Sequence, residues 1–275
     1  MITFFYAEYK GDAMHLCIQK SIFLCLILSI VIEADDTINK RIGMLIWQNE
    51  AAQRTDLLAF WNSSEPFPSF GIGHFIWYPA HQPIIHTQQF PTLCDYLQKN
   101  GILLPQWLID ALPKGAPWKS REAFLADFMR VQELRTILKG TVALQTSFII
   151  ESLETAWPSI LKAIPQAKKK QVQSIYTLMK SFPLGTYTLI DYCNFKGTGL
   201  NPKERAGKKG WGLLHVLMHM PPHLTTANVT QAFVISAAQL LLNRIYHNGP
   251  DYTLLSFFNG WMKRLNSYTD THLFS

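Results

Sequence analysis

The sequence predicts a mostly helical α+β protein, with a small β-hairpin lobe beside a larger helical lobe. The 275 residues are 48% hydrophobic and 16% charged, which is typical of a globular protein with a sizeable core. Apolar residues recur at helical spacing through most of the chain after residue 118. Between residues 57 and 78, turn-forming residues, glycines and aromatics instead indicate short extended segments.

The first 34 residues are expected to form a secretory signal. Lys20 precedes an apolar run over residues 22–32, and the small residue Ala34 follows at a suitable cleavage point. The run is shorter than the roughly 20 residues that a membrane-spanning helix needs. Met14 is an alternative start, and an uncleaved anchor or a buried helix is the competing interpretation. We therefore expect an exported protein, periplasmic or extracellular, whose mature chain has no stable membrane span.

The expected mature chain is basic. Removing residues 1–34 takes two lysines from 25 basic residues and three acidic residues from 19, which leaves a net charge of +7. Such a protein is attracted to cell-wall polymers, lipid head groups or nucleic acid, and export makes nucleic acid the least expected partner. Cys94 and Cys193 either pair in an oxidising compartment or remain as buried thiols.

A helix is expected from residue 38 to Glu50. Asp35 and Asp36 offer helix N-caps, and apolar residues then recur at helical spacing up to Ile46. Glu50 lies four residues after Ile46 and therefore continues the inward stripe. Burial raises the pKa of a carboxyl group toward the range useful for an acid. A surface glutamate at a frayed helix end is the competing interpretation.

The segment after this helix is expected to form a small hairpin. Residues 61–66 carry turn-forming residues, while Gly71 and Gly73 permit tight backbone geometry before Tyr78. Gly71-Ile72-Gly73 is not a dinucleotide-binding loop, because the third glycine is missing and no strand and helix flank it.

The remaining chain is expected to be almost wholly helical. Short helices are expected at 92–99 and near 105–112, and the helical lobe, residues 119–275, then follows the first lobe, residues 35–118. Its helices are expected at 120–138, 141–156, 168–181, 185–194, 210–219, 228–247 and 251–267, with breaks at glycines and at prolines such as Pro158. The polar loop 196–209 separates two apolar helices, where binding groups are often placed.

Motifs for several other chemistries are missing. His215, His219 and His223 follow helical spacing, but the prolines after His219 end that helix, so we expect neither a metal site nor a cofactor. The sequence has no nucleophile elbow and no phosphate-binding loop. An acid, polar groups and aromatic rings remain, and these suit the cleavage of a glycosidic bond.

The stretch Ser69-Phe70-Gly71-Ile72-Gly73-His74-Phe75 resembles the active-site segment of phage-type lysozymes. In that family a helix ends at a catalytic Glu, a hairpin carries an Asp, and a Thr precedes a Gly-Ile-Gly-His turn. Ser69 falls on the Thr, and Ser63 or Asn62 falls on the Asp. The resemblance covers residues 38–78. With Asn194-Phe195-Lys196-Gly197 and Gly210-Trp211-Gly212, more of the chain is similar to uncharacterised bacterial exported lysozyme-like proteins.

The resemblance implies a lysozyme-like two-lobed fold that cleaves the β-1,4 bonds of peptidoglycan, as a muramidase or a lytic transglycosylase. Glu50 would be the general acid. Because the Asp is missing, Glu204 is the first choice for a second carboxylate, ahead of Glu65 and Asp191, or Glu50 acts alone. The expected catalytic residues are Glu50, Ser69 and Glu204; the expected substrate-binding residues are Trp61, Asn62, Ser63, His74, Trp77, Asn194, Arg205 and Trp211. The alternative is a non-catalytic glycan-binding or structural cell-envelope protein. In either case we expect a monomer.

Overall fold

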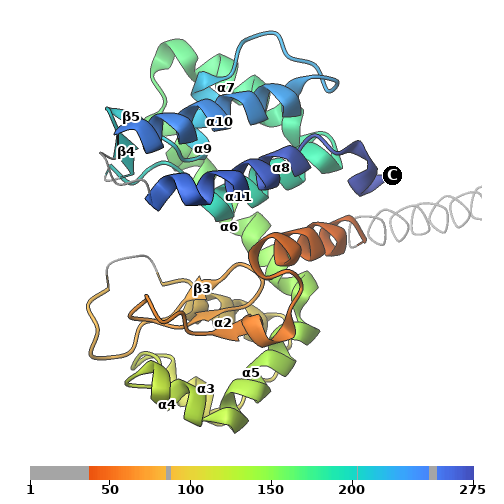
Figure 1. Ribbon diagram of the computed structural model, residues 1–275. Coiled ribbons are helices and arrows are strands. Elements are labelled where there is room, and N and C mark those ends of the chain that lie inside the picture. Colours follow the sequence, from red (N-terminus) through yellow and green to blue (C-terminus); the bar gives the residue numbers. More distant parts are fainter. Residues whose placement is uncertain (1–36, 85–87, 203, 248–252) are drawn as a thin grey trace, which may run out of the picture.

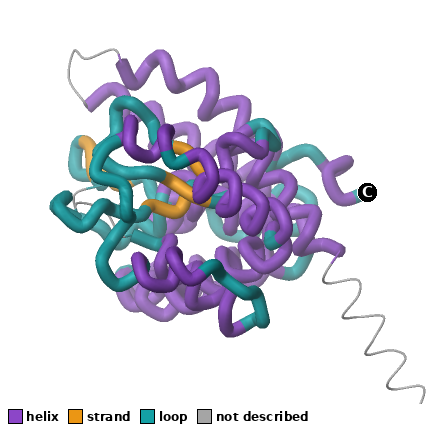
Figure 2. The backbone as a smooth tube through the Cα atoms, turned by 90° about the horizontal axis from the view of Figure 1, so that it is seen from below, coloured by secondary structure: helices purple, strands orange, loops and turns teal. Residues whose placement is uncertain are grey.

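The computed structural model describes residues 37–84, 88–202, 204–247 and 253–275. The predicted class is confirmed: the described chain is mostly helical, with two small antiparallel sheets. Figure 2 shows how short the strands are beside the helices that surround them. The expected signal segment lies outside the described residues. In the described part, no helix is long and apolar enough to cross a membrane.

The first lobe surrounds a three-stranded sheet (Figure 1). A helix spans residues 37–51 and leads into the short helix η1 (Thr55–Leu58). The sheet has the order β1 (Ala59–Phe60), β2 (Ser69–Phe70) and β3 (Phe75–Ile76), all antiparallel. Four helices complete the lobe: α2 (Phe90–Lys99), α3 (Gln106–Ala111), α4 (Arg121–Ala126) and α5 (Phe128–Gly140). Aromatic rings fill the core of this lobe, where Phe70 stacks on Phe90 with ring centroids 4.2 Å apart.

The predicted lobe boundary at residue 118 is wrong, because α4 and α5 belong to the first lobe. Helix α5 packs against η1 and β1. Arg135 on α5 donates from Nη2 to the carbonyl of Ala59 at 3.0 Å. Arg121 on α4 donates from Nε to the carbonyl of Trp61 at 2.9 Å. The two helices therefore cover the sheet instead of starting the helical lobe.

Helix α6 (Val142–Ala163) runs from the first lobe into the second (Figure 1). The prediction that Pro158 ends this helix is wrong. The helix continues through Pro158, and Leu153 and Ile160 are buried on either side of it. Packing of both flanks offsets the backbone hydrogen bond that a proline within a helix cannot make.

The second lobe is a bundle of helices (Figure 1). They are α7 (Gln166–Lys180), α8 (Pro183–Lys196), α9 (Leu213–His219), α10 (Val229–His247), α11 (Thr253–Ser267) and the short η2 (Thr271–Phe274). The polar loop after α8 carries a hairpin of β4 (Arg205–Ala206) and β5 (Lys209–Gly210).

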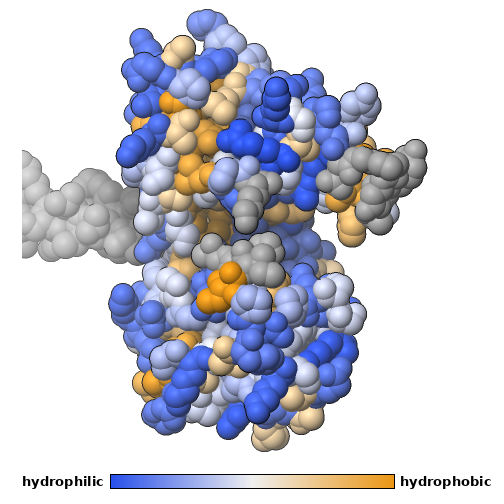
Figure 3. Space-filling model, turned by 90° about the vertical axis from the view of Figure 1, so that its left-hand side faces the viewer, coloured by the Kyte–Doolittle hydropathy of each residue, from blue (hydrophilic) through white to orange (hydrophobic). Residues whose placement is uncertain are grey.

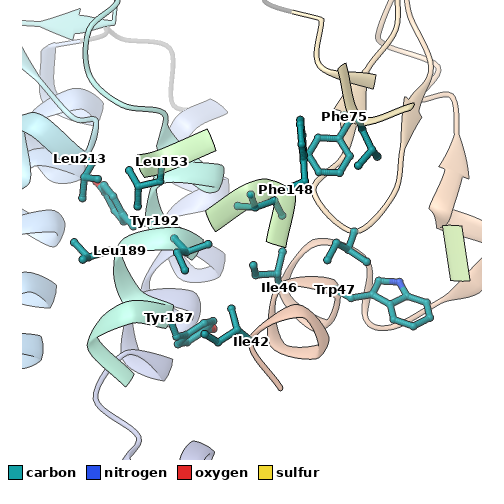
Figure 4. Packing of buried hydrophobic residues seen from close by; sticks show 14 of the residues in the cluster. Ile42, Ile46, Trp47, Phe75, Phe148, Leu153, Tyr187, Leu189, Tyr192 and Leu213 are labelled. Atoms are coloured by element: carbon teal, nitrogen blue, oxygen red, sulfur yellow. The ribbon is translucent and has the colours of Figure 1, made fainter. Parts of the chain in front are cut away.

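The helix of residues 37–51 lies at the junction of the two lobes. Its buried Ile42 and Ile46 point toward Tyr187 of α8 on one side and toward Phe148 of α6 on the other (Figure 4). Arg41 of this helix also donates from Nε to the carbonyl of Leu273 in η2 at 3.0 Å. Figure 3 shows the surface hollowed between the two lobes. Side chains at the end of this helix can therefore meet groups from both lobes.

Candidate functional site

Glu50 lies in the last turn of the helix of residues 37–51. The helix ends abruptly, because Ala52 and Gln53 both adopt the left-handed conformation, with φ of 48° and 56°. The Glu50 side chain is 15% exposed. The prediction that Glu50 points inward, and not into solvent at a frayed end, is therefore confirmed.

Three separate elements supply the partners of the Glu50 carboxylate. Arg264 of α11 donates from Nη2 to Oε1 at 2.7 Å, and Asn194 of α8 donates from Nδ2 to the same oxygen at 3.0 Å. His74, in the turn between β2 and β3, places Nδ1 3.6 Å from Oε2. Oε1 is therefore occupied by two donors, while the imidazole lies near Oε2 at more than hydrogen-bond distance.

The pKa of Glu50 is lowered in this site. Burial has the largest single effect and raises the pKa. Two electrostatic interactions, with Arg264 and His74, and two hydrogen bonds, from Arg264 and Asn194, lower the pKa and together outweigh burial. The prediction of a raised pKa is therefore wrong for the free protein. The sequence shows the inward position of Glu50, but not the arginine that reaches it from the far end of the chain.

The glycine turn carries His74 and lies close to Asn194 of α8. Gly71 has φ of +71°, and a methyl group there would lie 2.4 Å from Oε1 of Gln145. That buried oxygen of α6 accepts the Ile72 N–H at 2.9 Å and so fixes the turn to the helix behind it. A methyl group at Gly73 would lie 3.0 Å from Oδ1 of Asn194. Both glycines are therefore needed for close approach.

A buried network behind Glu50 is centred on Asp191 of α8. Arg264 donates to it twice, from Nε to Oδ2 and from Nη2 to Oδ1, both at 2.8 Å. The Tyr268 hydroxyl donates to Oδ2 at 2.6 Å, and Asn49 donates from Nδ2 to both oxygens at 3.3 Å. Asn49 Nδ2 also reaches the Tyr187 hydroxyl at 2.7 Å. Both carboxylate oxygens of Asp191 therefore accept hydrogen bonds, and Asp191 holds Arg264 in position.

The sequence reasoning missed Arg264 and Tyr268 as site residues. A signal was available, since Arg264 lies on the apolar stripe of the expected helix 251–267, where Trp261 and Leu265 are also buried, and Tyr268 continues this spacing just after the helix ends. A charged residue within such a stripe needs a partner. Which partner it finds is not visible from helical spacing.

Two tryptophans predicted to line sugar subsites belong to the core, so that prediction is wrong. Trp77 is 0% exposed and lies among the rings of Phe70, Phe90 and Trp118. Trp61 is 4% exposed, contacts Phe124 edge-on and donates from Nε1 to the carbonyl of Glu65 at 2.9 Å. A sugar cannot stack on rings that are already covered.

Apart from His74, the polar residues of the hairpin that were predicted for the site form no hydrogen bond or ion pair with Glu50 in the described part of the structure. Ser69 is buried in β2. Asn62 and Ser63 are exposed in the turn after β1, where Asn62 Oδ1 accepts from the backbone N–H and the hydroxyl of Ser64. Glu65 is exposed in the same turn.

The loop after α8 carries three residues that were predicted to belong to the site at Glu50: Glu204, Arg205 and Trp211. Glu204 is half-buried beside Gly197, and its charge acts on Arg244 and Cys193; no described contact joins it to Glu50. Trp211 is half-buried under the guanidinium of Arg244, 4.1 Å from Cζ to the ring centroid. Arg205 is exposed on β4. A second carboxylate opposite Glu50 is thus not supplied by Glu204 here.

Cys94 and Cys193 are free thiols, so the disulfide alternative is wrong; Cys94 is a buried thiol, as the other alternative predicted, whereas Cys193 is half-buried. Burial raises the pKa of both, that of Cys193 to about 12. Within the described ranges, no three His, Cys, Asp or Glu side chains are close enough to hold a metal ion.

Comparison with known proteins does not identify a family for this chain. The sequence matches no protein-family model. No curated protein and no solved structure matches the chain significantly. The function therefore has to be inferred from the residues around Glu50.

Proposed function

We propose that this protein is a lysozyme-like, two-lobed glycosidase that cleaves the β-1,4 bonds of peptidoglycan with Glu50 as its general acid. The observation that carries the proposal is the setting of Glu50. It lies at a helix end between two lobes, meets a glycine turn from the first lobe and accepts a hydrogen bond from Asn194 of the second. A glycan chain held between the lobes would place a glycosidic oxygen beside this carboxyl group.

The two oxygens of Glu50 suggest which one delivers the proton. Oε1 accepts from both Arg264 and Asn194, whereas Oε2 faces His74 at 3.6 Å. Oε2 is therefore the oxygen that would carry the proton to the leaving sugar oxygen as the bond to the anomeric carbon breaks. Water would then complete hydrolysis, or a hydroxyl of the same sugar would complete a transglycosylation with Glu50 taking up its proton.

A carboxyl group with a lowered pKa must gain a proton before it can act as an acid. Burial is already the largest influence on Glu50 and raises its pKa. A sugar that excludes the remaining water would strengthen this effect. Arg264 would also remain well bound if it moved away from Glu50, because Asp191 accepts two hydrogen bonds from it.

The decisive experiment compares wild type with Glu50→Gln on purified sacculi. Wild type should release soluble muropeptides, and Glu50→Gln should release none while still binding the sacculi. Glu122→Gln serves as the matched control, since Glu122 is an exposed glutamate of α4 and its loss should leave release unchanged. If wild type releases nothing between pH 4 and pH 8, the enzymatic proposal fails. Anhydro ends on the products would identify transglycosylation.

The second candidate is a glycan-binding protein that does not cut its ligand. The ion pair between Glu50 and Arg264 supports it, because this pair holds the carboxyl group in its ionised form. In that case sacculi would bind without product release. Glu50→Gln would then bind about as well as wild type.

A further inference from the structure

A row of alternating cations and aromatic rings leads away from Glu50. Arg264 lies with Cζ 4.2 Å from the ring centroid of Phe195. The ammonium of Lys196 lies 3.8 Å from the centroid of the same Phe195 ring and 3.9 Å from the centroid of the Trp261 ring. Arg244 of α10 follows, with Cζ 5.6 Å from the centroid of Trp261 and 4.1 Å from that of Trp211. We call this set the cation–aromatic row.

The charges of the row are not equally compensated. Arg264 forms ion pairs with both Glu50 and Asp191. Lys196, by contrast, forms no ion pair or hydrogen bond with any described side chain; its ammonium contacts the rings of Phe195 and Trp261. Arg244 is attracted by Glu204, but burial still lowers its pKa. The part of the row beyond Arg264 therefore carries more positive charge than negative.

Holding Lys196 in this place costs free energy. Its pKa is lowered to about 7, first by burial and then by the positive charges of Arg244 and Arg264, while Glu50 raises it. Ring faces attract a cation, but they do not replace an anion for a desolvated ammonium. A negatively charged group bound beside Lys196 would relieve this cost.

We infer that Lys196 and Arg244 form a subsite for a carboxylate of the glycan bound at Glu50. This inference rests on the proposed function and adds the place where an acid group of the substrate is bound. A guanidinium presents paired donors that match a carboxylate, and an ammonium adds a compact charge. The half-buried Trp211 lies at the end of the row, against the guanidinium of Arg244.

Two sources can supply the carboxylate: an acid substituent on the sugar itself, or a peptide attached to it. Binding would be measured calorimetrically in the Glu50→Gln background, which prevents turnover. Three ligands are compared: peptide-bearing glycan strands, peptide-free strands that keep their sugar acids, and peptide-free strands whose carboxyl groups have been reduced to alcohols. Tight binding of the second ligand assigns the subsite to the sugar acid, and tight binding of the first alone assigns it to the peptide.

Lys196→Met and Arg244→Met test the residues. Each should weaken binding of the acidic strands at least tenfold and leave binding of the reduced strands unchanged. Lys196→Arg keeps the charge and should retain most of the affinity. Lys263→Met is the matched control, because Lys263 is an exposed lysine of α11, the helix that carries Trp261 and Arg264. Circular dichroism and urea unfolding would show that each variant folds.

Proton uptake gives a readout that a merely structural role would not produce. At pH 8 most Lys196 side chains in the free protein are neutral, and binding of a carboxylate should return the proton. Titrations in buffers with different ionisation heats should reveal this uptake, and Lys196→Met should abolish it. The charged groups that also act on Lys196 are Arg244, Arg264 and Glu50, and the Glu50→Gln background removes one of them.

The results separate this inference from the proposed function. Equal affinity for acidic and reduced strands, unaffected by Lys196→Met, would overturn the inference even if wild type cleaves sacculi. Binding of acidic strands that depends on Lys196, in a protein that releases no product, would support the inference and reject the enzymatic proposal.

Discussion

Glu50 and Asp191 share a single nitrogen of Arg264, whose Nη2 lies 2.7 Å from Glu50 Oε1 and 2.8 Å from Asp191 Oδ1. Asp191 is fully buried and also accepts from the Tyr268 hydroxyl. Solvent therefore reaches Glu50 but not the carboxylate that fixes its arginine. We infer that Asp191 is a positioning residue, which acts on Glu50 through Arg264.

The first prediction concerns the pH dependence of cleavage. Because the pKa of Glu50 is lowered, only a small fraction of this carboxyl group is protonated at neutral pH. The value of kcat/KM should therefore rise as the pH falls from 7 toward 5, by up to about tenfold per pH unit. Removing the charge of Arg264 should raise the pKa of Glu50 and move this rise to higher pH. The double variant Asp191→Asn/Arg264→Gln removes both charges together, so that Asp191 is not left as an unpaired buried anion. Muropeptide release between pH 4 and pH 8 is the measurement.

Three results bear on this prediction. Wild type and the double variant should differ in the position of the profile, with the variant more active at pH 7 relative to its own maximum. An identical profile would mean that Arg264 does not set the pKa of Glu50. A shift to lower pH would contradict the sign of the argument.

The second prediction concerns the stability of the Asp191 network. Asp191→Ala leaves Arg264 buried with only Glu50 to pair with, and should cost about 3–5 kcal/mol of unfolding free energy. Tyr268→Phe removes one charge-assisted hydrogen bond and should cost about 2 kcal/mol. Tyr246→Phe is the control, because Tyr246 is 82% exposed, and its cost should be below about 0.5 kcal/mol. Urea unfolding at pH 7 measures all three; similar costs for the two tyrosines would rule out the hydrogen bond as a stabilising contact.

Local sequence signals predicted much of the helical structure and part of the site. Helical spacing predicted 228–247 and 251–267, where the structure has α10 and α11 over 229–247 and 253–267. The inward position of Glu50 was also predicted. His74 and Asn194, which were predicted to bind substrate, lie beside Glu50 in the structure. These features depend on periodicity or on a short motif, so neighbouring residues along the chain are enough to reveal them.

Features that depend on contacts between distant segments were not predicted. Arg264 reaches Glu50 from the last helix, and nothing in the spacing of either helix pairs them. The burial of Trp61 and Trp77 depends on α2, α4 and the Trp118 segment, which cover rings that the sequence shows only as aromatic. The same limitation placed α4 and α5 in the wrong lobe, because their partners in η1, in β1 and just after β1 lie sixty or more residues earlier.

The third prediction concerns the two cysteines. Cys94 and Cys193 are free thiols with raised pKa values in the structure, so neither should react with a thiol reagent in the folded protein. In denaturant without reductant, both should react. Thiol titration with Ellman's reagent in the two states is the measurement. Recovery of fewer than two thiols in denaturant would indicate a disulfide or oxidation, and rapid reaction in the folded state would contradict the burial.

The last prediction separates backbone strain from steric contact in the glycine turn. Gly71 and Gly101 both have positive φ, +71° and +82°, so alanine is strained at either position. At Gly101 a methyl group would have no other atom within 4 Å, and Gly101→Ala should cost only the conformational strain, about 1–2 kcal/mol.

At Gly71 the methyl group would also lie 2.4 Å from Oε1 of Gln145, the buried oxygen that accepts the Ile72 N–H. Gly71→Ala must therefore move the turn or break that hydrogen bond, and should cost about 2 kcal/mol more than Gly101→Ala. Because the same turn carries His74, Gly71→Ala should also reduce muropeptide release, whereas Gly101→Ala should not. Equal losses of stability in urea unfolding would show that the turn relaxes freely, and Gln145 would then have no part in fixing His74 beside Glu50.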